Sequence, residues 1–324
     1  MKSRIRRLSC YAHLFRNWPM VLYQKARGRK LISVTLRDGS KGVCSPDCVA
    51  KLVDLEDKMN LQVWTDLHFR GDSLYVRDYE VREWDYNRDW GIVFSLAGWK
   101  KEGSIWTSER HGVKFPAITM SLFETFELGE YGEFPLRGKE VVDVGANMGD
   151  TAVFFASRGA SKVIAYEPIP KVYQLALESV RLNGYEGRVQ VHNCAIGSKE
   201  GEVEVPADLS LEESLSFTSL AEGGKRRVRV PLVTLGHAMA RISEPYLLKM
   251  DCEGCEYDVI LNSPGYVGEF QTALIEHHAV ITGINVSVVL EKLRELGFNC
   301  DLVDSQFTGY PRNMTGLLVC EKRR

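Results

Sequence analysis

The sequence lacks any segment that would place the protein in or across a membrane. No apolar run in the 324 residues approaches the roughly 18 residues that a transmembrane helix needs. The N-terminus has no apolar stretch followed by small residues, so no secretory signal is expected. These absences predict a cytoplasmic protein.

Acidic residues are missing from the first 30 positions, which contain nine lysines and arginines. The whole chain has a net charge of only −2, so the rest of it is acidic. Apolar residues interrupt this basic leader: Leu8, Tyr11, Leu14, Phe15, Trp18 and Leu22. We expect a solvated helix packed on its own domain. Peripheral contact with an anionic membrane is the alternative, and nucleic acid is a further one.

The eight cysteines show no spacing typical of zinc sites. Cys44 and Cys48 form one lone pair, and Cys252 and Cys255 form another, without a matching second pair. In a long chain without a secretory signal, scattered cysteines indicate reduced thiols. No metal site is therefore assigned.

Two regions follow from the pattern of apolar residues. Residues 1–115 read as an α+β region that carries the basic leader. Residues 116–324 alternate strands and helices, which predicts a mostly parallel, Rossmann-like α/β sheet with helices on both faces. The predicted strands cover residues 140–144, 162–166, 189–193, 246–251, 273–277 and 316–320.

A glycine turn follows the first of these strands. Gly145 and Gly149 are four residues apart and enclose Asn147. Asp150 and Thr151 then favour the start of a helix, whose free N–H groups suit an anion. The dinucleotide pattern G-x-G-x-x-G is absent, which disfavours an NAD- or FAD-dependent oxidoreductase.

This turn resembles motif I of the S-adenosylmethionine (SAM)-dependent methyltransferases. The resemblance places Asp143 near the methionine end of SAM. Glu167 ends the second strand 22 residues after Gly145, where a carboxylate can accept hydrogen bonds from both ribose hydroxyls, and Pro168 stops that strand. In such enzymes the loop after the third strand packs the adenine, which implicates Cys194 and Ala195.

A second polar motif ends the strand at residues 246–251. Lys249 and Asp251 share one face of that strand because side chains alternate. Glu253 and Glu256 would share a face of a helix that begins at Gly254. Three carboxylates exceed what a helix start needs, so we interpret them as a functional site.

Together, DVGANMGDT at residues 143–151, YEP at 166–168, CAIG at 194–197 and KMDCEGCE at 249–256 resemble the FkbM-type methyltransferase family. The resemblance covers roughly residues 116–320. It implies a SAM-dependent O-methyltransferase that acts on a hydroxyl of a sugar, a glycan or a small natural product.

Methyl transfer to a hydroxyl needs a base, for which Asp251 is the first candidate and His277 the second. Lys249 would tune Asp251 or contact the acceptor, and Glu253 and Glu256 would bind acceptor hydroxyls. A divalent cation on Asp251, Glu253 and His277 is chemically reasonable but not expected.

Two other function classes stay open. One is a methyltransferase with an RNA or protein acceptor, supported only by the basic leader; the Asn-Pro-Pro-aromatic signature of many amino-group methylators is absent after Met250. The other is a non-catalytic SAM-fold module, which the presence of both glycines, Glu167 and the acidic cluster disfavours.

Overall fold

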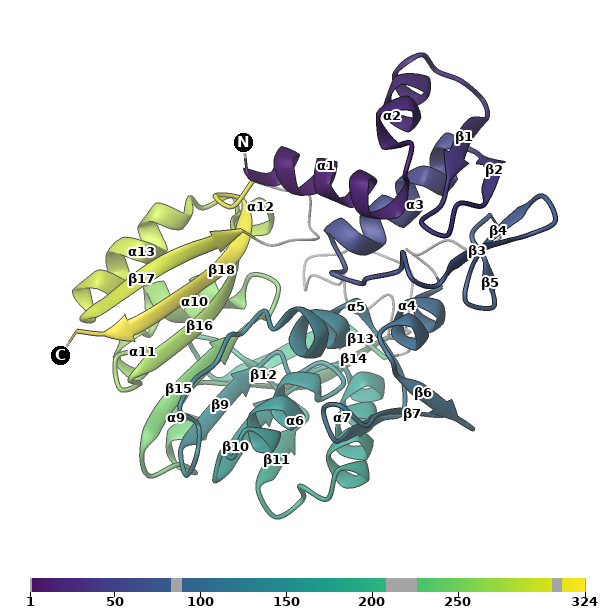
Figure 1. Ribbon diagram of the computed structural model, residues 1–324. Coiled ribbons are helices and arrows are strands. Elements are labelled where there is room, and N and C mark those ends of the chain that lie inside the picture. Colours follow the sequence, from purple (N-terminus) through teal and green to yellow (C-terminus); the bar gives the residue numbers. More distant parts are fainter. Residues whose placement is uncertain (1, 83–88, 208–225, 305–310, 324) are drawn as a thin grey trace. The chain divides into compact units, whose positions relative to one another are not determined.

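The computed structural model describes residues 2–82, 89–207, 226–304 and 311–323, in which the chain forms two compact units (Figure 1). The first unit spans Met1–Lys101 and the second Glu102–Arg324. The boundary predicted at residue 116 falls inside the second unit. Within the described residues, no helix has the length and hydropathy needed to cross a membrane.

The first unit combines helices with small antiparallel sheets. Its elements are α1 (Lys2–Leu14), α2 (Trp18–Ala26), β1 (Ile32–Thr35), β2 (Lys41–Cys44), α3 (Pro46–Asp57), β3 (Leu67–Arg70), β4 (Ser73–Val76), β5 (Tyr79–Glu80), α4 (Trp90–Leu96) and the start of β6 (Lys100–Glu102). Arg7 of the basic leader lies 2.7 Å from Asp54 and 3.1 Å from Asp57 on α3. This pairing supports a leader helix packed on its own unit, and contact with a membrane stays a prediction.

A seven-stranded sheet forms the centre of the second unit, in the order β11-β10-β9-β15-β16-β18-β17. The strands are β9 (Glu140–Val144), β10 (Lys162–Tyr166), β11 (Val189–His192), β15 (Pro245–Met250), β16 (Thr272–His278), β17 (Phe298–Asp304) and β18 (Thr315–Lys322). Only β18 runs antiparallel to its neighbours in this sheet. The predicted Rossmann-like α/β sheet is confirmed, but β17 was not predicted.

Helices and smaller sheets surround these strands. They are β7 (Ile105–Ser108), β8 (Val113–Phe115), α5 (Met120–Phe123), the π-helix η1 (Glu124–Leu128), α6 (Asp150–Ser157), α7 (Pro170–Leu182), α9 (Gly236–Met239), α10 (Cys255–Asn262), α11 (Pro264–Val267), α12 (Ala279–Thr282) and α13 (Val286–Glu295). Strands β12 (Ala195–Ile196), β13 (Gly201–Pro206) and β14 (Arg227–Val233) form a separate sheet.

The two faces of the large sheet differ in polarity. Val142, Leu248 and Ile275 point to one face, where they join the core formed with α10 and α13. Their neighbours Asp143 and Lys249 point to the other face because side chains alternate along a strand. The buried charges of Asp143 and Lys249 therefore lie on the face away from α10 and α13.

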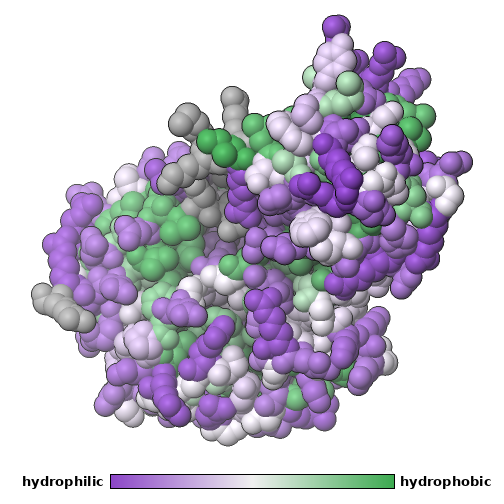
Figure 2. Space-filling view, viewed as in Figure 1, coloured by the Kyte–Doolittle hydropathy of each residue, from purple (hydrophilic) through white to green (hydrophobic). Residues whose placement is uncertain are grey.

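Four of the eight cysteines are paired in disulfides, so the prediction that all are reduced is wrong. Cys300 and Cys320 are direct neighbours on β17 and β18 and join these two strands. Cys252 and Cys255 form the second bond. Near Cys300 and Cys320, Figure 2 shows apolar residues gathered over β17 and β18. Val303 of β17 is 46% exposed.

The Cys300–Cys320 bond should stabilise the second unit. It closes a loop with a sequence separation of 20 residues, which corresponds to about 3 kcal/mol of unfolding free energy. We expect the double variant Cys300→Ala/Cys320→Ala to lose stability of this order in denaturant titrations without reductant. If the natural chain and the variant unfold at the same denaturant concentration, the bond contributes nothing.

Candidate active site

The turn after β9 requires a glycine because it packs directly against the turn after β15. Gly145 has φ of +79°, and a Cβ atom there would lie 1.7 Å from the carbonyl oxygen of Asp251. The backbone N–H of Asp251 donates to the carbonyl of Val144 at 3.0 Å. The two motifs found in the sequence thus meet at the carboxyl edge, where the strand order changes direction and ligands bind in such sheets.

Lys249 occupies the centre of this junction. Its side chain is buried, and its Nζ donates to the carbonyl of Gly145 at 2.8 Å. The same atom lies 3.4 Å from Oδ1 of Asp143 and 3.6 Å from Oδ2 of Asp251. Burial acts to lower the pKa of Lys249, but the surrounding carboxylates, Asp143 first, raise it overall, so the amine stays charged.

Asp143 is held by a neighbour from its own motif. The hydroxyl of Thr151 donates to Oδ2 of Asp143 at 2.6 Å, and both residues are buried. Burial raises the pKa of Asp143 against the opposing effects of Lys249 and Thr151. Asp150 faces the other way and accepts a hydrogen bond from Ser121 at 2.6 Å, and burial raises its pKa to about 6.

Glu167 follows β10 and organises the neighbouring loop. Its two carboxylate oxygens accept the N–H groups of Asn147 at 3.0 Å and Ile169 at 2.8 Å. Burial raises its pKa to about 8, although both hydrogen bonds act to lower it. Asn193 donates to the carbonyls of Glu167 and Pro168, both at 2.9 Å, which joins this loop to the end of β11.

The remaining predicted cofactor residues lie directly after Asn193. Cys194 is buried in the apolar core, and Ala195 begins β12. Their predicted position beside an adenine stays a prediction.

Several buried oxygens of the glycine turn have no hydrogen-bond donor among the described residues. They are Oδ1 of Asn147 and Asp150, and Oδ1 of Asp143 has only the Lys249 ammonium at 3.4 Å. Unsatisfied buried acceptors are costly, and they are suited to the donors of a bound ligand. The ammonium group and ribose hydroxyls of SAM are donors of this kind, so these residues fit SAM.

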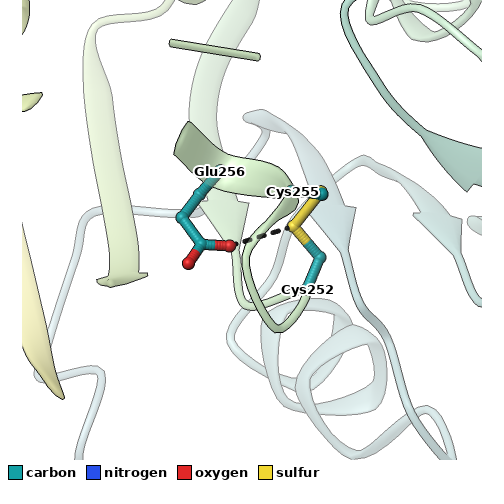
Figure 3. Close-up of side chains that lie close together, drawn as sticks. All are labelled: Cys252, Cys255 and Glu256. Carbon is teal, nitrogen blue, oxygen red and sulfur yellow. Dashed lines mark hydrogen bonds between the residues drawn. A yellow bond between two sulfur atoms is a disulfide. The ribbon is translucent and has the colours of Figure 1, made fainter. Parts of the chain in front are cut away.

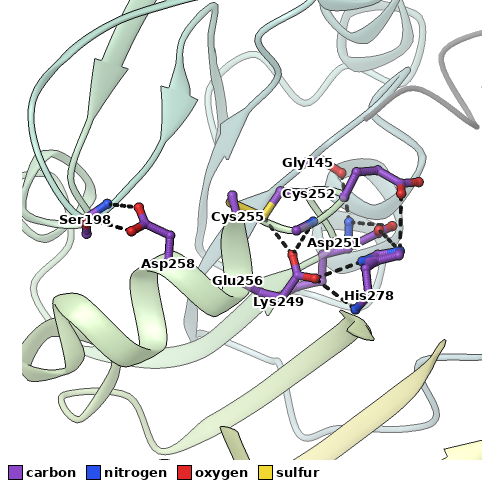
Figure 4. The surroundings of a disulfide bond; sticks show 11 residues. Gly145, Ser198, Lys249, Asp251, Cys252, Cys255, Glu256, Asp258 and His278 are labelled. Atoms are coloured by element: carbon purple, nitrogen blue, oxygen red, sulfur yellow. Dashed lines mark hydrogen bonds and ion pairs between the residues drawn. A yellow bond between two sulfur atoms is a disulfide. The ribbon is translucent and has the colours of Figure 1, made fainter. Parts of the chain in front are cut away.

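The acidic turn after β15 brings three carboxylates to one imidazole (Figure 4). Nδ1 of His278 lies 2.9 Å from Oε1 of Glu256, and its backbone N–H donates to the same oxygen at 3.0 Å. Its Nε2 lies 3.6 Å from Glu253 and 4.0 Å from Asp251. Burial disfavours the charged ring, but the bond to Glu256 and the three carboxylates outweigh it and raise the pKa of His278 to about 10.

His278 thus takes the place that the sequence interpretation gave to His277. Nε2 of His277 donates to the carbonyl of Arg312 at 2.8 Å, and its Nδ1 lies 3.3 Å from the hydroxyl of Tyr257. The ring is buried on the face that packs against α10. We therefore withdraw His277 as the second candidate base; His278 faces the site instead, where its raised pKa makes it a cation and not a base. The run Glu276-His277-His278 indicated that a histidine faces the site. Only the strand register shows which of the two histidines it is.

The role predicted for Glu256 also needs correction. Its carboxylate is fully buried and already accepts the N–H of Gly254 at 3.0 Å in addition to both bonds from His278. It has no exposed oxygen for an acceptor hydroxyl and instead fixes His278. Glu253 precedes α10 at φ +55°, so the two glutamates do not share a helix face as predicted.

Further carboxylates that the sequence interpretation missed lie near Asp251. Burial and the charges of neighbouring acids raise the pKa of Glu124 and Glu276 well above the usual range. Burial and Asp251 likewise raise the pKa of Glu130 to about 7. No periodicity links these residues, because Glu124 begins η1, Glu130 lies in the turn after it and Glu276 belongs to β16. The site therefore contains more carboxyl groups than the sequence motif indicates, and burial and their mutual repulsion favour the protonated form of these three.

Two groups of side chains in the described parts of the chain could approach one ion. Oxygen and nitrogen atoms of Asp251, Glu276 and His278 lie within 4.8 Å of one another, a set suited to a divalent cation. Cys252, Cys255 and Glu256 are equally close, but the two sulfur atoms are bonded to each other. The expectation that no metal is bound stays a prediction.

The sheet order, the glycine turn after β9 and the buried carboxylate after β10 define a SAM-dependent methyltransferase with a Rossmann-like sheet. Residues 143–300 match the model of the methyltransferase FkbM domain. This match confirms, for residues 143–300, the resemblance to FkbM-type methyltransferases found in the sequence.

Individual relatives share shorter or more distant similarity. Over 75 residues the chain is 41% identical to protein arginine N-methyltransferase 6 of Xenopus laevis, covering 23% of this chain and 22% of the relative. The Xenopus tropicalis protein of the same name is 40% identical over 75 residues. The chain thus spans about a fifth of the length of these curated relatives. A ribosomal protein L11 methylase from Lactobacillus delbrueckii subsp. bulgaricus is a similar structure, with 15% identity, a TM-score of 0.34, and coverage of 61% of this chain and 76% of that chain.

Replacing Gly145 should disrupt the junction of the two motifs. A Cβ in Gly145→Ala would overlap the carbonyl of Asp251, so we expect a stability loss on the order of 4 kcal/mol or more. The control is Gly187→Ala, where a Cβ meets nothing within 4 Å and φ is not positive. Denaturant unfolding of both variants measures the difference, and equal stabilities would contradict the close approach.

The buried carboxyls predict that the ligand-free protein becomes less stable as pH rises. Each raised pKa means that the folded state binds more protons than the unfolded state, from the usual 4.5 of a glutamate up to about 7 for Glu253 and Glu130 and about 8 for Glu167. Their contribution to the stability of the folded state is complete when the pH lies below the pKa in the unfolded chain. It disappears as the pH rises through the pKa in the folded protein. His278 acts in the same direction from 6.5 up to about 10.

Melting temperatures should therefore fall between about pH 5 and pH 8.5. Glu276→Gln removes one carboxyl with a raised pKa, so it should raise the melting temperature at the upper end and flatten the curve. Glu291→Gln on the exposed side of α13 is the control and should leave the curve unchanged. Parallel curves for all three proteins would contradict this account.

Proposed function

We propose that this domain transfers the methyl group of SAM to a hydroxyl oxygen of a sugar, a glycan or a small natural product. The observation that carries the proposal is the position of Asp251. Its carboxylate is partly exposed, while its backbone packs against the glycine turn of the cofactor motif. A base beside the end of the cofactor pocket is what deprotonation of an acceptor hydroxyl requires.

The cofactor would be held by the residues whose buried oxygens lack donors and by Glu167. Bound SAM supplies an electrophilic methyl group on a sulfonium. Asp143 and Asp150 provide negative charge for its cationic parts, and the carboxylate of Glu167 retains lone pairs for the ribose hydroxyls. Lys249 fixes the carbonyl of Gly145 and so holds the two turns together.

On the acceptor side, Asp251 would receive the proton of the acceptor hydroxyl, and bound SAM would supply the methyl group to that oxygen. The charged groups of Lys249 and His278 lie within 4.0 Å of the Asp251 carboxylate. Glu253 is a second partly exposed carboxylate, which burial brings to a pKa of about 7, and it would accept a hydrogen bond from the acceptor.

A protein acceptor is the second candidate, and the excess of carboxylates favours it. Asp251, Glu253, Glu276 and Glu130 would attract a cationic guanidinium as well as a neutral hydroxyl. The short similarity to protein arginine N-methyltransferase 6 points in the same direction. Mass spectrometry and NMR of the methylated product distinguish O-methylation from N-methylation.

Asp251→Asn should separate catalysis from cofactor binding. We expect methyl transfer in a screen of sugars, glycans and natural products to fall by about 100-fold or more, because the variant lacks the base. Calorimetric SAM affinity should change little, whereas Glu167→Gln should weaken it. Asp301→Asn, at an exposed position of β17, controls for the substitution itself.

Loss of both turnover and SAM binding in Asp251→Asn would show that Asp251 belongs to the cofactor pocket. Full turnover in that variant would remove it as the base.

A further inference from the structure

The Cys252–Cys255 bond lies inside the acidic turn of the candidate active site (Figure 3). The two cysteines enclose Glu253 and Gly254, and Cys255 is the first residue of α10. Both cysteines are partly exposed, whereas in the other disulfide Cys300 is partly exposed and Cys320 is fully buried. Thiol–disulfide exchange requires access to a sulfur atom, so Cys252–Cys255 offers two partly exposed residues for attack and Cys300–Cys320 offers one.

The sulfur of Cys252 contacts the carboxylate that fixes His278. Its Sγ lies 3.3 Å from Oε2 of Glu256. In the disulfide this sulfur carries no proton, so it cannot donate to the carboxylate. After reduction, the thiol can donate a hydrogen bond to Oε2. In the disulfide-bonded protein this oxygen accepts only the N–H of Gly254.

Glu256 transmits this change to the acceptor side of the site. Its other oxygen accepts both hydrogen bonds from His278, whose Nε2 faces Glu253 and Asp251. A new hydrogen bond to Oε2 draws negative charge away from Oε1. It therefore weakens the two hydrogen bonds that Glu256 accepts from His278. Three contacts, Cys252 to Glu256, Glu256 to His278 and His278 to Asp251, thus separate the redox-active sulfur from the proposed base.

The disulfide also constrains the backbone between the cysteines. Glu253 has φ of +55° and Gly254 has φ of +110°. A left-handed conformation is unfavourable for a glutamate and persists where its surroundings impose it. Here the bond joins the residues on either side of this turn, so its reduction allows Glu253 to relax away from His278.

We propose that Cys252 and Cys255 form a reversible redox-modification site in which the disulfide holds the acceptor side of the active site in its productive geometry. Reduction by a small dithiol breaks the sulfur–sulfur bond, forms two protein thiols and converts the reagent to its disulfide, with transfer of two electrons and two protons. A low-molecular-weight disulfide such as oxidised glutathione reverses the reaction and is itself reduced to two thiols. The effect on turnover rests on the proposed function, whereas the redox reaction itself does not.

The first test needs no methyl acceptor. The full chain is equilibrated in glutathione buffers of graded ratio, its thiols are alkylated, and each pair is quantified by mass spectrometry. We expect Cys252–Cys255 to be reduced at a less reducing ratio than Cys300–Cys320. In the same samples, NMR of the His278 ring should show a shift that follows reduction of Cys252–Cys255. A pair no more reducible than Cys300–Cys320, or an unchanged His278 signal, would overturn the proposal.

The second test measures turnover and SAM affinity in both redox states. Displacement of a positioning group by about 1 Å costs up to about 100-fold in rate, so we expect reduction to lower kcat by tenfold to 100-fold. SAM affinity should be unchanged. The double variant Cys252→Ser/Cys255→Ser should resemble the reduced protein in either buffer. The control Cys300→Ala/Cys320→Ala should keep the response to reductant.

The two proposals fail in different ways. Absence of methyl transfer in both redox states would count against the proposed function, and the alkylation and NMR measurements would still decide the redox site. Equal kcat for fully oxidised and fully reduced Cys252–Cys255 would overturn the redox proposal while leaving the methyltransferase proposal intact.

Discussion

The buried ammonium group of Lys249 is the interaction on which the candidate site depends. It bonds to the carbonyl of Gly145 and lies between Asp143 and Asp251, so one cation joins the turns that follow β9 and β15. A buried charge is costly unless it is paired and hydrogen-bonded, and here all three partners come from the two motifs. Lys249 therefore ties the geometry of the acceptor side to that of the cofactor side.

The sequence was sufficient to locate the turns that form the candidate cofactor pocket. A strand, a glycine turn and a carboxylate 22 residues later constrain one another through local geometry, so Gly145 and Glu167 could be assigned without knowing the sheet. The structure then joins them through the hydrogen bond from Asn147 to Glu167. The fold class was also predictable, since alternating strands and helices indicate a mostly parallel sheet.

The acceptor half could be predicted only in part, because it depends on contacts between segments far apart in the chain. His277 and His278 are adjacent, and the choice between them depends on the pairing of Lys249 with Leu274 in β15 and β16. Side chains alternate from that pair, so His278 shares the face of Lys249 and His277 does not. The disulfides were missed for a related reason: C-x-x-C spacing fits a thiol pair and a bond equally well, and Cys300 pairs with Cys320 through β17, which was not predicted.

The distribution of charge around Asp251 limits the chemistry of the acceptor. Burial and neighbouring acids raise the pKa of Glu124, Glu130, Glu253 and Glu276, and Lys249 and His278 are the positive groups that approach Asp251 in the described residues. Surroundings that disfavour ionisation of their own carboxyls also disfavour an added anion. A phosphate or carboxylate next to the reacting group would therefore bind poorly. A neutral polyol can use the same carboxylates as hydrogen-bond acceptors, and a guanidinium would bring the missing positive charge, so the site's electrostatics favour these two acceptor classes over anionic ones.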